Sequence, residues 1–211
     1  LALIRDELVA IKDKYGDARR TQLVDRTQGL TTARDLVKEE EVLIAVSGDK
    51  IWKELLSERR RGTSVGIGRE GLQAAITATS TGDVAFFTAD GMGALLPIHQ
   101  LPTGDAAACT LGELLSASAK AEISTMAALP AGTRDQESPG HVIFASALGR
   151  VKRVTLSDLY GLASRGLSVV MGIEAPDRLI GAAYSAGNED VVLVSSAGQA
   201  IRFSQEEVRP M

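Results

Sequence analysis

A short pattern recurs four times along this chain and limits the folds that the chain can adopt. Each copy has four apolar residues, a hydroxyl residue, a tight turn and a second strand-forming run. Val, Ile, Phe and Thr favour pleated β-structure, and a glycine in the turn gives the backbone freedom that a hairpin needs. The copies begin at Leu43, Val84, Val142 and Val191, and their hydroxyl residues are Ser47, Thr88, Ser146 and Ser195.

These hydroxyl residues are 41, 58 and 49 residues apart. A strand-rich unit that repeats about every 50 residues, with loops of varying length, is typical of propeller-like or solenoid arrays. Further apolar runs start at Gly71, Glu122 and Gly166 and are expected to supply the remaining strands of each blade. The prediction is an all-β, propeller-like array of four-stranded blades, and the alternative is an ordinary β-sandwich with similar-looking hairpins.

Composition excludes several other classes of protein. The chain has 211 residues, 45% apolar and 24% charged, which is an ordinary globular balance. Its net charge of −4 argues against a uniformly basic nucleic-acid binder but leaves room for a local basic patch. Cys109 is the single cysteine, so no internal disulfide can form, and no apolar run approaches the roughly 20 residues of a membrane span.

The first 39 residues follow a different pattern from the rest. Apolar residues alternate three and four apart, at Leu1, Ile4, Leu8, Ile11 and Tyr15, which predicts a two-heptad amphipathic helix ending near Gly16. Residues 17–39 are polar and are expected to form a linker. The domains predicted are therefore 1–39, the end of a long helix and a linker from an upstream core, and 40–211, a β-domain with about four blade openings, truncated from a larger disc.

Three strings give a resemblance to a known family. LIRDELVAIKDKYGDARRTQLV resembles the last helix and exit segment of the A subunit of bacterial type IIA DNA topoisomerases. DLVKEEEVLIAVSGDKIWKEL resembles the first blade of that subunit's C-terminal domain, and VVLVSSAGQAIRFSQEEVRPM resembles a later blade. The resemblance implies a β-pinwheel, a disc whose blades exchange strands, preceded by a short helix. In DNA gyrase the basic rim of this disc wraps DNA, whereas in topoisomerase IV a related disc binds DNA without the same wrapping.

The resemblance also implies partners and roles. The partners are duplex DNA, the ATPase B subunit, and the rest of the A subunit, with no membrane, in the bacterial cytoplasm and associated with the nucleoid. The fragment is expected to have no catalytic activity of its own, as part of an ATP-dependent isomerase that controls DNA supercoiling. It is expected to hold no cofactor, because ATP and magnesium belong to other parts of the holoenzyme. Tyr15, Tyr160 and Tyr184 are not assigned the DNA-cleaving role, which lies in an upstream domain of the family.

The family's basic heptapeptide, Gln-Arg-Arg-Gly-Gly-Lys-Gly, is only partly kept. After the first hairpin this chain reads SERRRGTSVGIGREG from Ser57, so Arg60 and Arg61 match the arginine pair while Arg59 replaces the glutamine. Three adjacent arginines before a glycine can place guanidinium groups on phosphates. The alternative is a charged, solvated loop, and the lost lysine and glycines weaken the case for gyrase-type wrapping.

The remaining candidate DNA contacts are distributed unevenly over the repeats. Side chains alternate along a strand, so Arg150 and Lys152 are expected to face the same side. The second repeat offers no basic residue in its hairpin, which predicts an interrupted DNA track. His99 and His141 lie far apart and are read as loop residues, not as metal ligands. The full candidate set beyond the arginine triplet is Lys50, Lys53, Arg150, Lys152, Arg153, Arg165 and Arg202.

Overall fold

The structure is a computed structural model that describes residues 2–16, 36–57, 71–115, 122–133, 140–163 and 166–210. The chain divides into one unit of residues 1–36 and a second of residues 37–211. In the first unit, helix α1 (Ala2–Tyr15) forms where the heptad spacing predicts it. The N–H of Gly16 bonds to the carbonyl of Lys12 at 2.7 Å, which closes its last turn.

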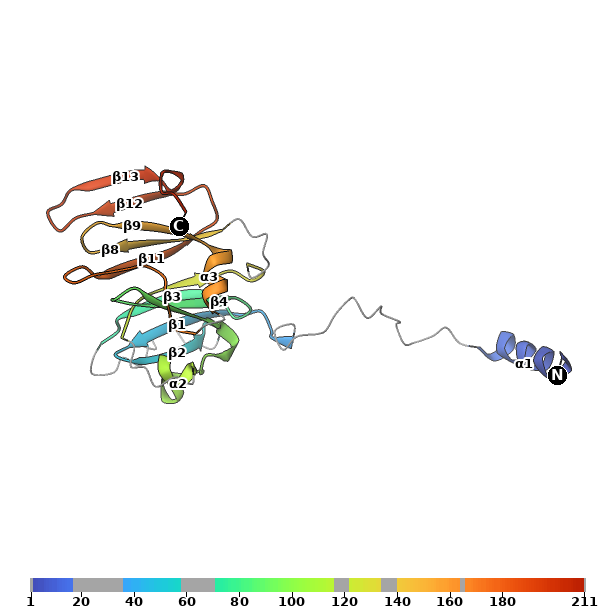
Figure 1. Cartoon of the computed structure of the whole chain (residues 1–211). Coiled ribbons are helices and arrows are strands. Elements are labelled where there is room, and N and C mark those ends of the chain that lie inside the picture. The colour runs from blue at the N-terminus through green and yellow to red at the C-terminus, as the bar shows by residue number, and fades with distance from the viewer. Residues whose placement is uncertain are drawn as a thin grey trace. The chain divides into compact units, whose positions relative to one another are not determined.

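The second unit consists of four small antiparallel sheets, which we call A to D (Figure 1). The predicted all-β class is therefore confirmed. Sheet A has the order β3 (Ala74–Thr79), β1 (Glu41–Ser47), β2 (Lys50–Leu55), β6 (Cys109–Thr110). Sheet B has the order β10 (Ser168–Val169), β5 (Met92–Pro97), β4 (Asp83–Thr88), β7 (Ile123–Leu129). Sheet C has the order β11 (Leu179–Ser185), β8 (His141–Ser146), β9 (Val151–Thr155), and sheet D pairs β12 (Asp190–Val194) with β13 (Ala200–Ser204).

Short helical segments connect these strands. Among its described residues the second unit has two α-helices, α2 (Leu111–Leu114) after β6 and α3 (Leu156–Ala163) after β9. Three 3-10 turns accompany them: η2 (Ile98–Gln100), η3 (Asp105–Ala107) and η4 (Gln205–Glu207). η2 follows the hairpin of sheet B and η4 follows the hairpin of sheet D, so the two turns occupy equivalent places in the repeat.

Sheets exchange strands, as the resemblance implies. β6 pairs with β2 of sheet A although it follows the hairpin of sheet B in the chain. In the same way β10 pairs with β5 of sheet B although it follows the hairpin of sheet C. Sheets A and B thus have the four strands expected of a blade, whereas the described residues give sheet C three strands and sheet D two.

The recurring hydroxyl residue holds the hairpin turn together. In sheet C the N–H of Arg150 donates to Oγ of Ser146 at 3.1 Å, and Gly149 takes the positive φ (82°) that the turn requires. The same bond forms from Met92 N to Thr88 and from Gln199 N to Ser195. The first repeat differs, because Ser47 pairs directly with Lys50 across a shorter turn. There the Ser47 hydroxyl donates instead to the carbonyl of Gly71 at 2.7 Å.

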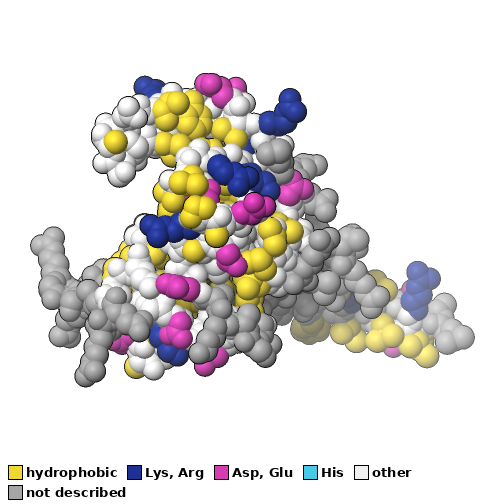
Figure 2. All heavy atoms as spheres, turned by 60° about the vertical axis from the view of Figure 1, so that its left-hand side comes forward, with side chains coloured by type: hydrophobic (Ala, Val, Ile, Leu, Met, Phe, Trp, Pro, Cys, Tyr) yellow, Lys and Arg dark blue, Asp and Glu magenta, His cyan; other side chains and the backbone are white. Residues whose placement is uncertain are grey.

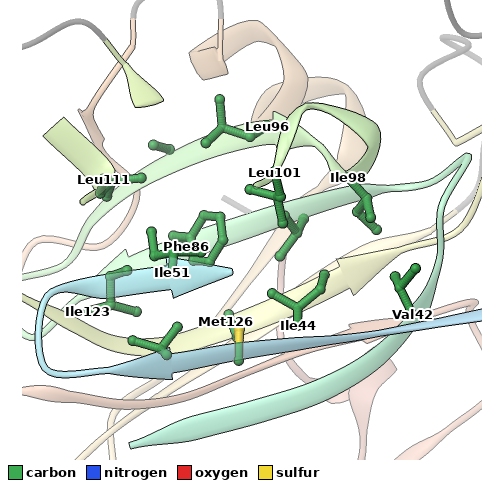
Figure 3. Close-up of a cluster of buried hydrophobic side chains, with 13 residues drawn as sticks. Val42, Ile44, Ile51, Phe86, Leu96, Ile98, Leu101, Leu111, Ile123 and Met126 are labelled. Carbon is green, nitrogen blue, oxygen red and sulfur yellow. The ribbon is translucent and has the colours of Figure 1, made fainter. Parts of the chain in front are cut away.

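Apolar side chains fill the spaces between successive sheets. Between sheets A and B, Ile44 and Ile51 meet Phe86 and Met126 (Figure 3). Between sheets B and C, the rings of Phe87 and Phe144 meet edge to face with centroids 4.9 Å apart. β4 is buried along its whole length because it carries a packed layer on each face. This succession of layers excludes the two-sheet sandwich.

Sheet D is packed less completely than the others. Its strands are largely exposed, and a cleft of about 820 Å³ lies between its hairpin and that of sheet C. Ile180 and Leu193 are among the cleft-lining residues. In contrast, a polar contact joins helix α3, which follows sheet C in the chain, to sheet B: the Tyr160 hydroxyl donates to Asp83 at 2.9 Å and lies 2.9 Å from Oγ1 of Thr133.

Candidate nucleic-acid interface

Six of the ten predicted contact residues fall within the described structure. Arg59, Arg60, Arg61 and Arg165 lie outside the described residues. The six are Lys50, Lys53, Arg150, Lys152, Arg153 and Arg202.

Three of these cations occupy the same place in their repeats. Lys53 pairs with Ile44, Arg153 with Ile143 and Arg202 with Val192. Each of those partners lies three residues before the hydroxyl residue of its hairpin. Sheet B has Leu95 at this place, opposite Ala85. Ile44, Ala85 and Leu95 all belong to the packed layer facing the next sheet, so this position points between sheets.

Lys53 is the clearest case, and its surroundings argue against a contact with DNA. Its side chain is buried, with the residue 8% exposed, and its ammonium donates to the carbonyls of Ile98 and His99, both at 2.9 Å. Burial lowers the pKa of Lys53. A side chain held inside in this way cannot reach a phosphate on the surface. The sequence did not reveal this because alternation fixes the face of a strand but not what covers that face.

Arg153 and Arg202 are more accessible than Lys53. Arg153 is half-buried. The burial of His141, and then the positive charge of Arg153, lower the pKa of His141. An isolated parallel bridge joins Arg153 to Pro210, just as Lys53 is joined to Thr103. Arg202 is exposed and forms an ion pair with Asp190, its Nε lying 2.7 Å from the carboxylate. That carboxylate competes with any phosphate for the guanidinium group.

Arg150 stands at the end of the turn just before β9, and Lys152 is on β9. Nη1 of Arg150 donates to the carbonyl of Gly172 at 3.3 Å, and Nζ of Lys152 donates to the carbonyl of Val170 at 2.8 Å. Both cations are therefore steered onto one short segment. A guanidinium has five N–H donors and an ammonium three, so donors remain for a phosphate.

Lys50 stands at the hairpin end of sheet A. Its ammonium is 3.9 Å from the carboxylate of Glu113, and both side chains are substantially exposed. Hydrogen bonds from Thr110, and then the charge of Lys50, lower the pKa of Glu113. An exposed pair at this distance contributes little to stability and leaves the lysine free to exchange partners.

Arg178 is an exposed cation that the sequence analysis did not single out. Arg178 lies just before β11, and its carbonyl accepts a hydrogen bond from the N–H of Ala147 in the sheet C turn at 2.8 Å. No spacing along the chain links residues 147 and 178, so only the tertiary structure brings them together. On the face shown in Figure 2, Lys and Arg side chains occur at several levels, interleaved with Asp and Glu.

The described residues offer little for other chemistry. They contain no group of three or more His, Cys, Asp or Glu side chains that could hold a metal ion. Burial, and then the charge of Glu113, raises the pKa of the Cys109 thiol, which works against a reactive thiolate. In the part of the chain that the structure describes, no helix is long and apolar enough to cross a membrane.

Four small sheets with exchanged strands and apolar layers between them define the class: a propeller-like β-domain. Residues 140–185 and 189–211 match the family described as DNA gyrase C-terminal domain, beta-propeller. A solved gyrase A C-terminal domain superposes with a TM-score of 0.66 and 17% identity, over 82% of this chain and 57% of that one. A solved topoisomerase IV C-terminal domain superposes with a TM-score of 0.60 and 20% identity, over 83% of this chain and 55% of that one. Both structures show the same fold.

Curated relatives match along nearly the whole chain. The DNA gyrase A subunit of Mycolicibacterium smegmatis is 30% identical over 99% of this chain and 26% of its own length. The corresponding protein of Haloquadratum walsbyi is 27% identical over 99% of this chain and 25% of its own length. This chain therefore spans about a quarter of these relatives. The matches confirm the predicted resemblance to the C-terminal domain of the A subunit of type IIA DNA topoisomerases.

Proposed function

We propose that this chain is a non-catalytic DNA-binding domain of a gyrase-type A subunit. It bends or wraps duplex DNA around its edge and presents a second segment for ATP-dependent strand passage by the holoenzyme. Its partners are duplex DNA, the ATPase B subunit, and the rest of the A subunit, in the cytoplasm and associated with the nucleoid.

The main supporting observation is the pair Arg150, just before β9, and Lys152, on β9, whose side chains are anchored to backbone carbonyls of the same short segment, residues 170–172. Cations that are anchored in place suit contact with a regular phosphate backbone. Bending about 20–30 base pairs by 40–90° costs roughly 1–6 kcal/mol, which several such contacts can offset. Lys50 extends the proposed contact set onto sheet A, and the arginine triplet at residues 59–61, with Arg165, completes it. Lys53 is left out because it is buried.

Two observations favour weaker binding than in a wrapping gyrase. Lys50 and Arg202 each lie beside a carboxylate, and the sheet B hairpin carries no cation. The second candidate function is accordingly a topoisomerase IV-type domain that binds DNA with little or no wrapping. A protein-interaction module without DNA binding is the third, motivated by the net charge of −4.

A salt-titrated duplex-binding assay on the whole chain tests the proposal. Each phosphate neutralised adds about −0.9 to the slope of log K against log salt, so four to six contacts give a steep dependence. Replacing Arg60, Arg61, Arg150 and Lys152 together with alanine is expected to flatten the slope. Undetectable binding at low salt, or an unchanged slope in the variant, contradicts the proposal. DNA minicircle topology then separates wrapping from simple binding.

A further inference from the structure

The four hairpin tips of the second unit differ in what surrounds them. At the sheet B tip, a Cβ on Gly91 would come within 1.9 Å of the carbonyl of Met171. The Gly91 carbonyl also accepts hydrogen bonds from the N–H groups of Val170 and Met171. At the sheet C tip, a Cβ on Gly149 would meet nothing within 4 Å, and Leu148 beside it is 68% exposed. The sheet C tip is therefore open where the sheet B tip is covered.

Two arginines from distant parts of the chain meet at the open tip: Arg150 ends the turn, and the Arg178 backbone bonds to it through Ala147. Arg150 and Arg178 are both exposed, and the side chain of Arg178 has no hydrogen bond or ion pair with the residues that the structure describes. The backbone of Arg178 is fixed at both ends: its carbonyl accepts from Ala147 N and its N–H donates to Oδ1 of Asp177 at 2.8 Å. The backbone that carries this exposed side chain is thus held beside the turn.

The nearest acid is committed to the turn itself. Oδ1 of Asp177 also accepts the N–H of Leu148 at 3.0 Å, so the carboxylate ties the loop before β11 to the hairpin. Burial opposes ionisation of Asp177, but hydrogen bonds from Ser146, Leu148 and Arg178 and the charge of Arg150 together lower its pKa. Two arginines against one carboxylate leave the tip with a net positive charge.

We propose that this surface, the sheet C tip of Leu148, Gly149, Arg150 and Arg178, is a phosphate-contact surface and that Arg178 is one of its contact residues. This inference rests on the proposed DNA-binding function and deepens it. The small glycine lets a phosphodiester backbone approach closely, while the two guanidinium groups bind its oxygens. None of the other three described tips combines an uncovered turn with two exposed arginines: sheet A has Lys50 beside Glu113, sheet B is covered, and sheet D has Gln199 in place of a cation.

Arg178→Ala in the whole chain is the test, with binding to a duplex measured at several salt concentrations. The expected result is several-fold weaker binding and a salt slope smaller in magnitude by about 0.9, the value for one lost phosphate contact. Arg178→Lys keeps the charge and is expected to keep most of the slope. Lys38→Ala is the matched control, because it removes one exposed positive charge from a residue that pairs with Glu40.

The outcomes separate this inference from the proposed function. If Lys152→Ala flattens the salt slope but Arg178→Ala does not, the assignment of Arg178 as a contact residue is wrong and the DNA-binding function stands. If Arg178→Ala and Lys38→Ala weaken duplex binding equally, the loss reflects only the total charge of the chain, and this result also overturns the inference. If the unmodified chain binds no duplex at low salt, the proposed function itself fails. Thermal unfolding verifies that each variant is folded.

Discussion

Nζ of Lys53 in sheet A lies 2.9 Å from the carbonyl oxygen of Ile98, in the turn that follows the hairpin of sheet B. A second bond of the same length reaches His99. The ammonium therefore fastens one sheet to the turn of the next. We expect Lys53→Met to lower the free energy of unfolding by about 1–3 kcal/mol, because it removes two buried hydrogen bonds to a charged group.

Urea unfolding measures this loss, and Lys50→Met on the same strand is the control. An exposed substitution is expected to stay within about 0.5 kcal/mol of the parent chain. Lys53→Met is also expected to leave the salt slope of DNA binding unchanged. A flatter slope in the folded variant shows that Lys53 does contact DNA, and unchanged stability shows that the two bonds merely balance the desolvation of the ammonium.

The hydroxyl of Tyr160 joins helix α3 to sheet B through the fully buried Asp83. Tyr160→Phe leaves that carboxylate short of one donor, so we expect a loss of about 1–3 kcal/mol in unfolding free energy. Tyr184→Phe is a matched control, since the Tyr184 hydroxyl makes no hydrogen bond to the described residues. Chemical denaturation measures both variants. If Tyr160→Phe and Tyr184→Phe change the free energy of unfolding by the same amount, the Tyr160–Asp83 bond does not stabilise the fold.

The turn bond of sheet C is buried, whereas its counterpart in sheet D is exposed. Ser146 is 3% exposed and accepts the N–H of Arg150. Ser146→Ala is expected to cost about 0.5–1.5 kcal/mol, since it removes the acceptor that this largely buried hydroxyl offers to the turn. That loss corresponds to a drop in Tm of roughly 1–6 °C for a chain of this size. Ser195→Ala should shift Tm less, because water replaces its hydroxyl, and a larger shift for Ser195→Ala is the contrary result.

Acid is expected to weaken the end of sheet C through Glu189. Hydrogen bonds from the Ser185 hydroxyl, and then from backbone N–H groups led by Gly187, lower the pKa of this carboxyl below its ordinary 4.5. A folded-state pKa below the unfolded one means that the unfolded chain binds the proton more readily. The stabilisation is therefore complete above the ordinary value and is lost as pH falls through the folded-state pKa.

Denaturant titrations of the parent chain and of Glu189→Gln, between neutral pH and about pH 3, test this linkage. The stability difference between the two chains should shrink on acidification. A difference that is constant or grows towards low pH contradicts the assignment.

Much of this architecture could be predicted from local chemistry. The apolar run, hydroxyl and glycine of each repeat specify a hairpin by themselves, because strand propensity, the turn acceptor and a positive φ are properties of adjacent residues. The heptad spacing likewise specifies α1. Side-chain alternation predicted that Arg150 and Lys152 face the same side, and both side chains reach the segment 170–172.

Tertiary structure decided what each cation meets, because burial depends on which sheet packs against which. Lys53 and Arg202 occupy one register position, yet the first is enclosed by the neighbouring turn and the second lies in solvent beside Asp190. Arg178 reaches the sheet C tip only through a contact between residues 31 positions apart, Ala147 and Arg178. Short-range sterics along the chain determine the strands and their faces, whereas long-range packing decides which charges remain free to bind.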